Sequence, residues 1–184
     1  MKKIIVVFMS LMLCLFAFAP VAFSDTEGNA TAAMNVTVDP NITVGDNPDE
    51  VRMSVQTGDV SGAFVFRVDA NMQYVDIQVG ASHLYKADDP ESEVAPILVN
   101  EGAGVEVDPN SGEGANLAFN NSSDYDINGF PAVKTQTGTF ESSQNGHFSQ
   151  NVDVVVTWNQ DDPEKPQGDY SGFVQFYCMM VGDI

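Results

Sequence analysis

The chain has 184 residues and a formal net charge of −19 at pH 7, because 26 acidic residues face only 7 basic ones. Such an excess of negative charge repels nucleic acid and anionic membrane surfaces, so neither is expected as a partner. Basic partners, divalent cations and neutral ligands are compatible with it.

The first 24 residues have the pattern of a secretory signal peptide. Two lysines precede an apolar run from Ile4 to Phe18, which is too short to span a bilayer comfortably. Pro20 and a small-residue A-x-S site that ends at Ser24 follow this run. We therefore predict that residues 1–24 are removed, that the protein is secreted, periplasmic or at the cell surface, and that the mature chain has no membrane span.

Two other interpretations of this segment stay open. Ile4 to Phe23 could serve as an uncleaved anchor, and Cys14 could carry a lipid, although Leu13 is bulkier than the residue that a lipidation site needs before its cysteine. Removal of residues 1–24 leaves about 160 residues with a charge of about −21, enough for one domain, residues 25–184. Cys178 is then the sole cysteine, which predicts a buried thiol and no internal disulfide.

Alternation of apolar and polar residues, which is typical of strands with one buried face, dominates the rest of the chain. After a polar leader, the apolar positions of the first such segment are Ala30, Ala32, Met34, Val36 and Val38, and the phase resumes after Pro40 at Ile42 and Val44. Further strands are predicted at Val51/Met53/Val55, Phe64/Phe66/Val68, Val75/Ile77/Val79, Val105/Val107, Leu117/Phe119, Val152/Val154/Val156/Trp158 and Val174/Phe176/Cys178/Met180. One helical turn is predicted at Pro90–Ala95. Polar turns separate the strands, so the sequence predicts a single antiparallel, immunoglobulin-like β-sandwich.

The last two predicted strands, Val152–Trp158 and Gly168–Val181, are expected to form a hairpin across a charged, proline-rich connection. Tyr170 is in phase with the face of the closing strand that is predicted to be core, which consists of Val174, Phe176, Cys178 and Met180. The opposite face is also apolar, with Phe173, Tyr177 and Met179. A strand that is apolar on both faces is expected at a sheet centre or at a subunit interface.

The closing segment Gly168–Phe176 reads G-x-Y-S-G-x-V-x-F. It resembles the final strand of immunoglobulin-like bacterial surface domains, including pilin-type subunits of the archaic chaperone–usher and spore-coat-protein-U-like kind. The same pattern is compatible with a corner residue of an unrelated sandwich, in which the hydroxyl of Tyr170 bonds to the backbone. The chain differs from typical chaperone–usher pilins in that it has no cysteine pair and no penultimate tyrosine.

Residues 25–44 add a second resemblance, to the donor strand by which a pilin subunit fills the groove of its neighbour. The donor residues would be Ala30, Ala32, Met34, Val36 and Val38; an ordinary first strand of the chain's own sheet is the alternative. The resemblance implies a structural subunit of a cell-surface filament or coat that assembles by β-strand addition. Its expected partners are copies of itself, other surface subunits and a periplasmic chaperone.

One motif could hold a metal ion. Residues 124–129 fit D-x-D-x-N-G, the first half of a calcium loop, with Asp124, Asp126 and Asn128 as the oxygen ligands. A full twelve-residue loop would need an acid at Thr135, and an Asn-Gly hairpin turn flanked by acids explains the same pattern without a metal. No other cofactor is predicted.

No catalytic signature is present in the sequence. His83 and His147 have no suitably spaced partner, and there is no G-x-S-x-G motif, so the chain is predicted not to be an enzyme. The alternative to a structural subunit is a solitary secreted sandwich that binds carbohydrate or another ligand, with calcium if the acidic loop holds it. Exposed aromatic residues such as Tyr85, Tyr125 and Phe130 would then form the binding surface.

Overall fold

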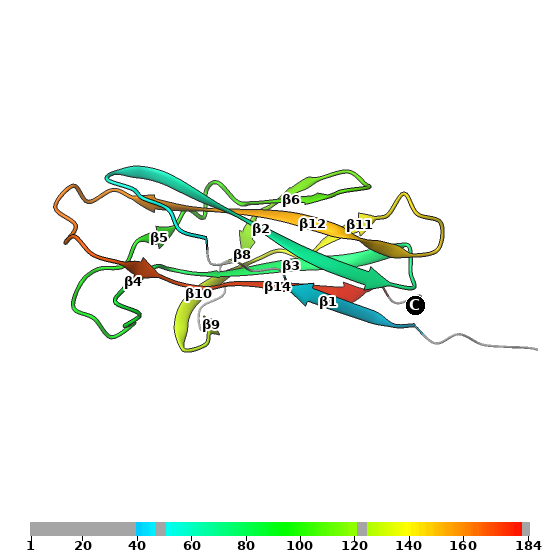
Figure 1. Cartoon of the computed structure of the whole chain (residues 1–184), viewed down its shortest axis with the longest axis horizontal. Coiled ribbons are helices and arrows are strands. Elements are labelled where there is room, and N and C mark those ends of the chain that lie inside the picture. The colour runs from blue at the N-terminus through cyan, green and yellow to red at the C-terminus, as the bar shows by residue number, and fades with distance from the viewer. Residues whose placement is uncertain (1–39, 47–50, 121–124, 182–184) are drawn as a thin grey trace, which may run out of the picture. The chain divides into compact units, whose positions relative to one another are not determined.

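The computed structural model describes residues 40–46, 51–120 and 125–181, which form a sandwich of two antiparallel β-sheets (Figure 1). The chain divides into Met1–Thr37, outside the described residues, and a compact unit, Val38–Ile184. Within the described ranges every element is a strand, so the predicted fold class is confirmed. No helix with the length and apolarity of a membrane span occurs in that part of the chain. The predicted signal peptide and the donor positions from Ala30 to Val38 lie outside it.

The first sheet is built around two 13-residue strands, β2 (Gly58–Ala70) and β12 (Phe148–Gln160), which pair along their whole length. Strand β1 (Ile42–Asp46) pairs with the outer edge of β2. On the other side of β12 lie β6 (Val105–Pro109), followed by β7 (Ala115–Leu117), and the short β5 (Leu98–Val99). Both edges of β12 are therefore occupied.

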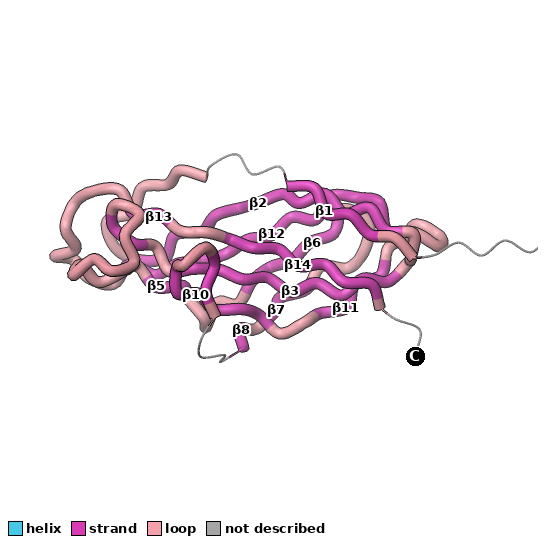
Figure 2. Tube along the Cα trace, turned by 90° about the horizontal axis from the view of Figure 1, so that it is seen from below, coloured by secondary structure: helices cyan, strands magenta, loops and turns pink. Residues whose placement is uncertain are grey.

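The second sheet is centred on β3 (Tyr74–Ser82). One edge of β3 pairs with β14 (Val174–Met180), and the other edge pairs in succession with β11 (Gly138–Glu141) and β10 (Phe130–Thr135), as Figure 2 shows in part. Two short strands, β8 (Phe119–Asn120) and β9 (Asp126–Ile127), pair with β10. Two short strands form a separate pair. They are β4 (Tyr85–Lys86), which follows β3 in the chain, and β13 (Tyr170–Ser171), which precedes β14.

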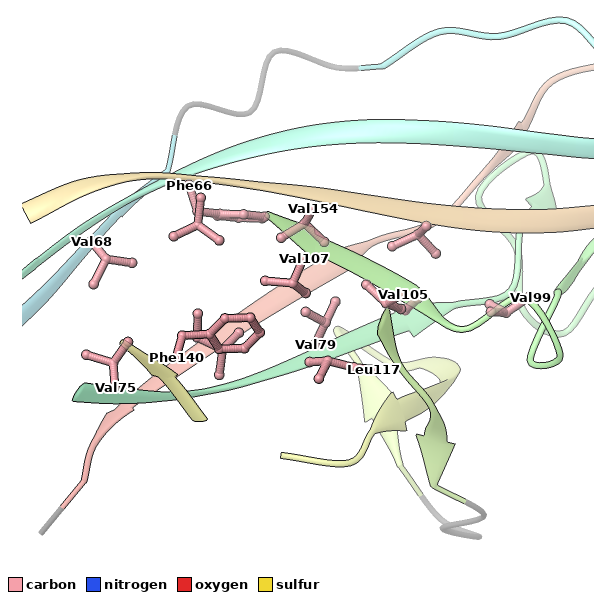
Figure 3. Close-up of a cluster of buried hydrophobic side chains, with 14 of the residues drawn as sticks. Phe66, Val68, Val75, Val79, Val99, Val105, Val107, Leu117, Phe140 and Val154 are labelled. Carbon is pink, nitrogen blue, oxygen red and sulfur yellow. The ribbon is translucent and has the colours of Figure 1, made fainter. Parts of the chain in front are cut away.

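The core lies between the two sheets, because alternate residues of each strand point inward. On β3 these residues are Val75, Ile77, Val79 and Ala81, and all four are fully buried. They pack against Phe66, Val107 and Val154 of the first sheet (Figure 3). Trp158 joins the layers as well, since its indole Nε1–H donates a hydrogen bond of 2.9 Å to the carbonyl oxygen of Ser82 on β3.

The predicted hairpin of the last two strands is wrong. β12 belongs to the first sheet and β14 to the second, so the connection between them crosses from one layer to the other. The physical reason is that β2 occupies one edge of β12 and β5 and β6 occupy the other, which leaves no edge for β14. The hydroxyl of Tyr170 donates a hydrogen bond of 2.9 Å to the carbonyl of Pro166, which is the backbone bond that the corner-residue interpretation predicts.

Three local predictions also fail. Residues 51–55 form no strand. Leu117 and Phe119 belong to β7 and β8, which lie in different sheets, so the predicted single strand is divided at Ala118. Residues 90–95 form turns instead of a helical turn, because side-chain oxygens of Asp89 and Ser92 accept hydrogen bonds from the backbone two residues ahead and compete with helix formation.

Candidate functional site

Strand β14 covers its side of the core incompletely. Its inward-facing residues Val174, Phe176 and Cys178 pack against the core, and the ring of Phe176 stacks on Phe66 with 4.7 Å between ring centroids. All three side chains are nevertheless only half-buried, whereas Val79 and the other inward residues of the neighbouring β3 are 0% exposed. The sandwich is therefore open along this strand.

The backbone of β14 is also open on that side. β3 pairs with its inner edge, and no strand of the described ranges pairs with its outer edge. β1, the edge strand of the other sheet, lies against β14 (Figure 1). We call the outer edge of β14, together with Val174, Phe176 and Cys178, the open edge. The sequence pattern predicted a sheet centre or an interface, and the structure places β14 at a sheet edge.

The second apolar face of β14 points away from the core. Tyr177 and Met179 on this face are 37% and 47% exposed, and Phe173, just before the strand, is 40% exposed. Apolar side chains that are this exposed on an edge strand are a feature that soluble domains usually avoid, because a strand edge is a template for pairing with another chain. The exposed face therefore adjoins the open edge on the same strand.

Cys178 points to the core side of the open edge. Burial raises the pKa of its thiol to about 12, and the negative charge of Asp76 adds to the shift. The thiol is consequently protonated at neutral pH and weakly nucleophilic. This agrees with the predicted structural thiol, although Cys178 is half-buried and not fully enclosed.

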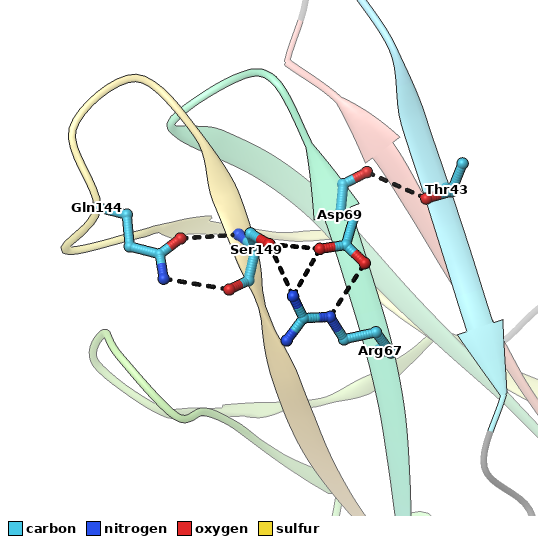
Figure 4. A network of polar contacts seen from close by, with 5 residues as sticks. All are labelled: Thr43, Arg67, Asp69, Gln144 and Ser149. Atoms are coloured by element: carbon cyan, nitrogen blue, oxygen red, sulfur yellow. Dashed lines mark hydrogen bonds and ion pairs between the residues drawn. The ribbon is translucent and has the colours of Figure 1, made fainter.

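A polar network of side chains links β2 to β12 near β1 (Figure 4). The guanidinium of Arg67 binds both carboxylate oxygens of Asp69, at 2.6 and 3.0 Å, and also donates to the hydroxyl of Ser149 at 2.7 Å. Ser149 donates to Asp69 in turn. The hydrogen bonds from Arg67 and Ser149 lower the pKa of the Asp69 carboxyl. The hydroxyl of Thr43 on β1 donates to the carbonyl of Asp69, and so the network reaches the edge strand.

Two of the three aromatic residues predicted to form a ligand surface are buried. Tyr85 and Phe130 are 6% and 9% exposed, and they form an edge-to-face cluster in which Phe130 also contacts Phe173. The prediction that they are exposed is wrong, because the pair β4–β13 and the start of β10 bring these rings together. Tyr125 is half-buried, and its hydroxyl donates to Oε1 of Gln175 at 2.9 Å.

The acidic motif forms a hairpin turn between β9 and β10. Asn128 and Gly129 have φ angles of 55° and 84°, as a type I′ turn requires, and the backbone N–H of Gly129 donates to the Asp126 carboxylate at 3.2 Å. Asp124 lies outside the described residues. The described ranges bring together no group of three His, Cys, Asp or Glu side chains suited to a metal. The turn explains the motif without a ligand, and calcium binding stays a prediction.

His83 is held by the fold in its neutral form. Its Nδ1 accepts a hydrogen bond of 3.1 Å from the backbone N–H of Val99, and burial lowers its pKa, although the charge of Glu101 opposes the shift. Protonation of Nδ1 would remove this acceptor. This role explains the half-buried His83 in structural terms.

The lowered pKa of His83 predicts a pH dependence of stability. The unfolded chain takes up a proton near pH 6.5, and the folded chain does so only at lower pH. The free energy of unfolding is therefore expected to fall as the pH decreases from about 6.5 toward the folded pKa, and the His83 contribution is fully present above that window. Urea unfolding at several pH values between 5 and 8 measures how steeply the free energy of unfolding changes with pH. This pH dependence should become weaker in His83→Gln and should persist when the exposed His147 is changed to Gln. An unchanged pH dependence in His83→Gln would contradict the assignment.

Comparison with known proteins assigns no relationship: no family model matches the chain, and no curated protein matches it.

Proposed function

We propose that the protein is a non-enzymatic structural subunit of a cell-surface filament or coat, whose copies associate by β-strand addition at the open edge. The observation that carries the proposal is the incomplete burial of Val174, Phe176 and Cys178 next to an outer edge that no described strand pairs. A strand added there would gain main-chain hydrogen bonds from β14 and would bury these side chains.

The proposed occupant is the segment from Ala30 to Val38 of a second copy. Its apolar residues recur at every second position, so one face of an added strand would be apolar and the other polar. A strand with one apolar and one polar face suits the open edge, where an added strand would turn one face to the core and the other to solvent. In the chain, the segment ends four residues before the first residue of β1, Ile42, and β1 itself borders the open edge.

The open edge also supports the expectation of a chaperone partner. A subunit that has been synthesised but not assembled would expose the β14 backbone and half-buried core residues, which favours aggregation. A periplasmic protein that covers the edge temporarily would prevent this. The alternative function, ligand binding through exposed aromatic residues, has less support, because Tyr85 and Phe130, two of the three residues proposed for that surface, are buried.

Deletion of residues 25–38 from the mature chain is expected to leave a folded sandwich that no longer forms oligomers, because the strand donor is removed while the core of the described sandwich is kept. Light scattering coupled to size-exclusion chromatography measures the mass, and circular dichroism checks the fold. Deletion of the polar leader 25–29 alone is the matched control and should leave oligomers intact. An intact chain that is monomeric at all concentrations, or a deletion that unfolds the protein, would contradict strand donation.

A further inference from the structure

The outer face of the second sheet carries a pair of tyrosines whose hydroxyl groups meet. The hydroxyl oxygens of Tyr125 and Tyr177 lie 3.2 Å apart, although the residues are 52 positions apart in the chain. All five tyrosines of the protein are in the described residues, and the hydroxyl groups of Tyr74 and Tyr170 instead bind Glu141 and the backbone of Pro166. The Tyr125–Tyr177 contact joins the segment before β10 to the last strand.

The surrounding residues hold Tyr125 in this position. The site beneath it is Gly80, where an added Cβ would lie only 2.5 Å from the tyrosine hydroxyl oxygen, so the close approach requires glycine. Gln175 accepts the hydroxyl proton of Tyr125 in a hydrogen bond of 2.9 Å. The ammonium group of Lys134 lies 5.4 Å from the centroid of the Tyr125 ring and makes a cation–π contact.

The pair is also accessible from solvent. Tyr177 is 37% exposed on the outward face of β14, and Tyr125 is half-buried above the same sheet. A small oxidant can therefore reach the rim of the pair without unfolding the sandwich. The neighbouring ring is already in place, so a radical formed on one tyrosine meets its partner without diffusion through solvent.

We propose that Tyr125 and Tyr177 are an oxidative cross-linking site, at which a haem peroxidase with hydrogen peroxide forms a dityrosine bond within one chain. Each phenol loses one electron and one proton and becomes a phenoxyl radical, whose unpaired electron is shared with the ring carbons next to the oxygen. The two radicals join through one carbon–carbon bond between these ring carbons. The hydrogen on each coupled carbon then moves to the oxygen, and the peroxide takes up two electrons and two protons to give two water molecules.

The cross-link would serve a chain that has no internal disulfide once residues 1–24 are removed. β14 is an edge strand near the chain end and is held on one side by β3. A covalent bond between Tyr125 and Tyr177 closes a long loop and restricts the unfolded chain, as a disulfide does in other secreted proteins. The inference does not rest on assembly, because both tyrosines belong to the same chain.

The test treats the full mature chain at low concentration with a haem peroxidase and hydrogen peroxide. The expected product has the mass of one chain less two hydrogen atoms, shows dityrosine fluorescence, and yields one pair of joined peptides that contain Tyr125 and Tyr177. Tyr177→Phe and, separately, Tyr125→Phe should each abolish this product. Tyr74→Phe is the matched control, because Tyr74 is more exposed on the same sheet, and it should leave the product unchanged.

Several outcomes would overturn the proposal: no dityrosine, joined peptides from other tyrosines, cross-links only between chains, or a product that persists in either Phe variant. The product should also raise the midpoint of thermal unfolding relative to the untreated chain, with no such rise in treated Tyr177→Phe. Failure of oligomer formation would leave these readouts unaffected, so the two proposals fail separately.

Discussion

Replacement of Met34 by aspartate is expected to abolish oligomer formation, whereas replacement of its neighbour Asn35 by aspartate should leave it intact. Met34 is in the apolar phase of the donor segment and would face the core at the open edge. A carboxylate buried there without a partner loses its hydration and destabilises the complex strongly. Asn35 is in the polar phase and would face solvent. Both substitutions add one negative charge, so charge repulsion between copies is matched.

Two measurements compare these variants. Sedimentation velocity gives the mass of the assembled species, and the rate of thiol labelling reports on Cys178, which lies on the core side of the open edge. Assembly should slow labelling in the unmodified chain and in Asn35→Asp, whereas Met34→Asp should label at the rate of the chain without residues 25–38. If the two variants assemble equally, or if assembly leaves the labelling rate unchanged, the segment does not occupy the open edge.

Replacement of Phe148 by alanine is expected to lower the free energy of unfolding by about 3–5 kcal/mol, the usual cost of a cavity left by a fully buried phenylalanine. Phe148 is 0% exposed at the start of β12. The same change at Phe176 should cost only about half as much in the monomer, because Phe176, whose ring stacks on Phe66, is only half-buried on β14.

Urea unfolding of the chain without residues 25–38 makes this comparison in the absence of a donor strand. In the assembled protein, Phe176→Ala should become more costly than in the monomer, while the cost of Phe148→Ala in the fold of each subunit should not change. Equal losses of unfolding free energy for Phe148→Ala and Phe176→Ala in the monomer would mean that the core is closed along β14. The side chains of the open edge would then be fully packed in the monomer, which contradicts the proposal.

The sequence determined that the long alternating segments around β2, β3, β12 and β14 are strands and which of their side chains face inward. The alternation of Val75, Ile77 and Val79, and that of Val152, Val154 and Val156, specifies one buried face per strand, and both sets are fully buried. Local chemistry also determined the Asn-Gly hairpin turn and the corner role of Tyr170, because these contacts lie within a few residues of each other. Gly80, within an alternating strand, was a signal of close approach by another group, although the partner, Tyr125, was not predictable from it.

Only the tertiary structure decided which strands are neighbours. A period of two specifies the face of a side chain but not the strand that pairs with each edge, and this choice depends on contacts between distant parts of the chain. For that reason the predicted hairpin between β12 and β14 was wrong, and Leu117 and Phe119 joined different sheets. The same long-range pairing buried Tyr85 and Phe130, brought Tyr125 to Tyr177, and left β14 at an edge with its inward face half-covered.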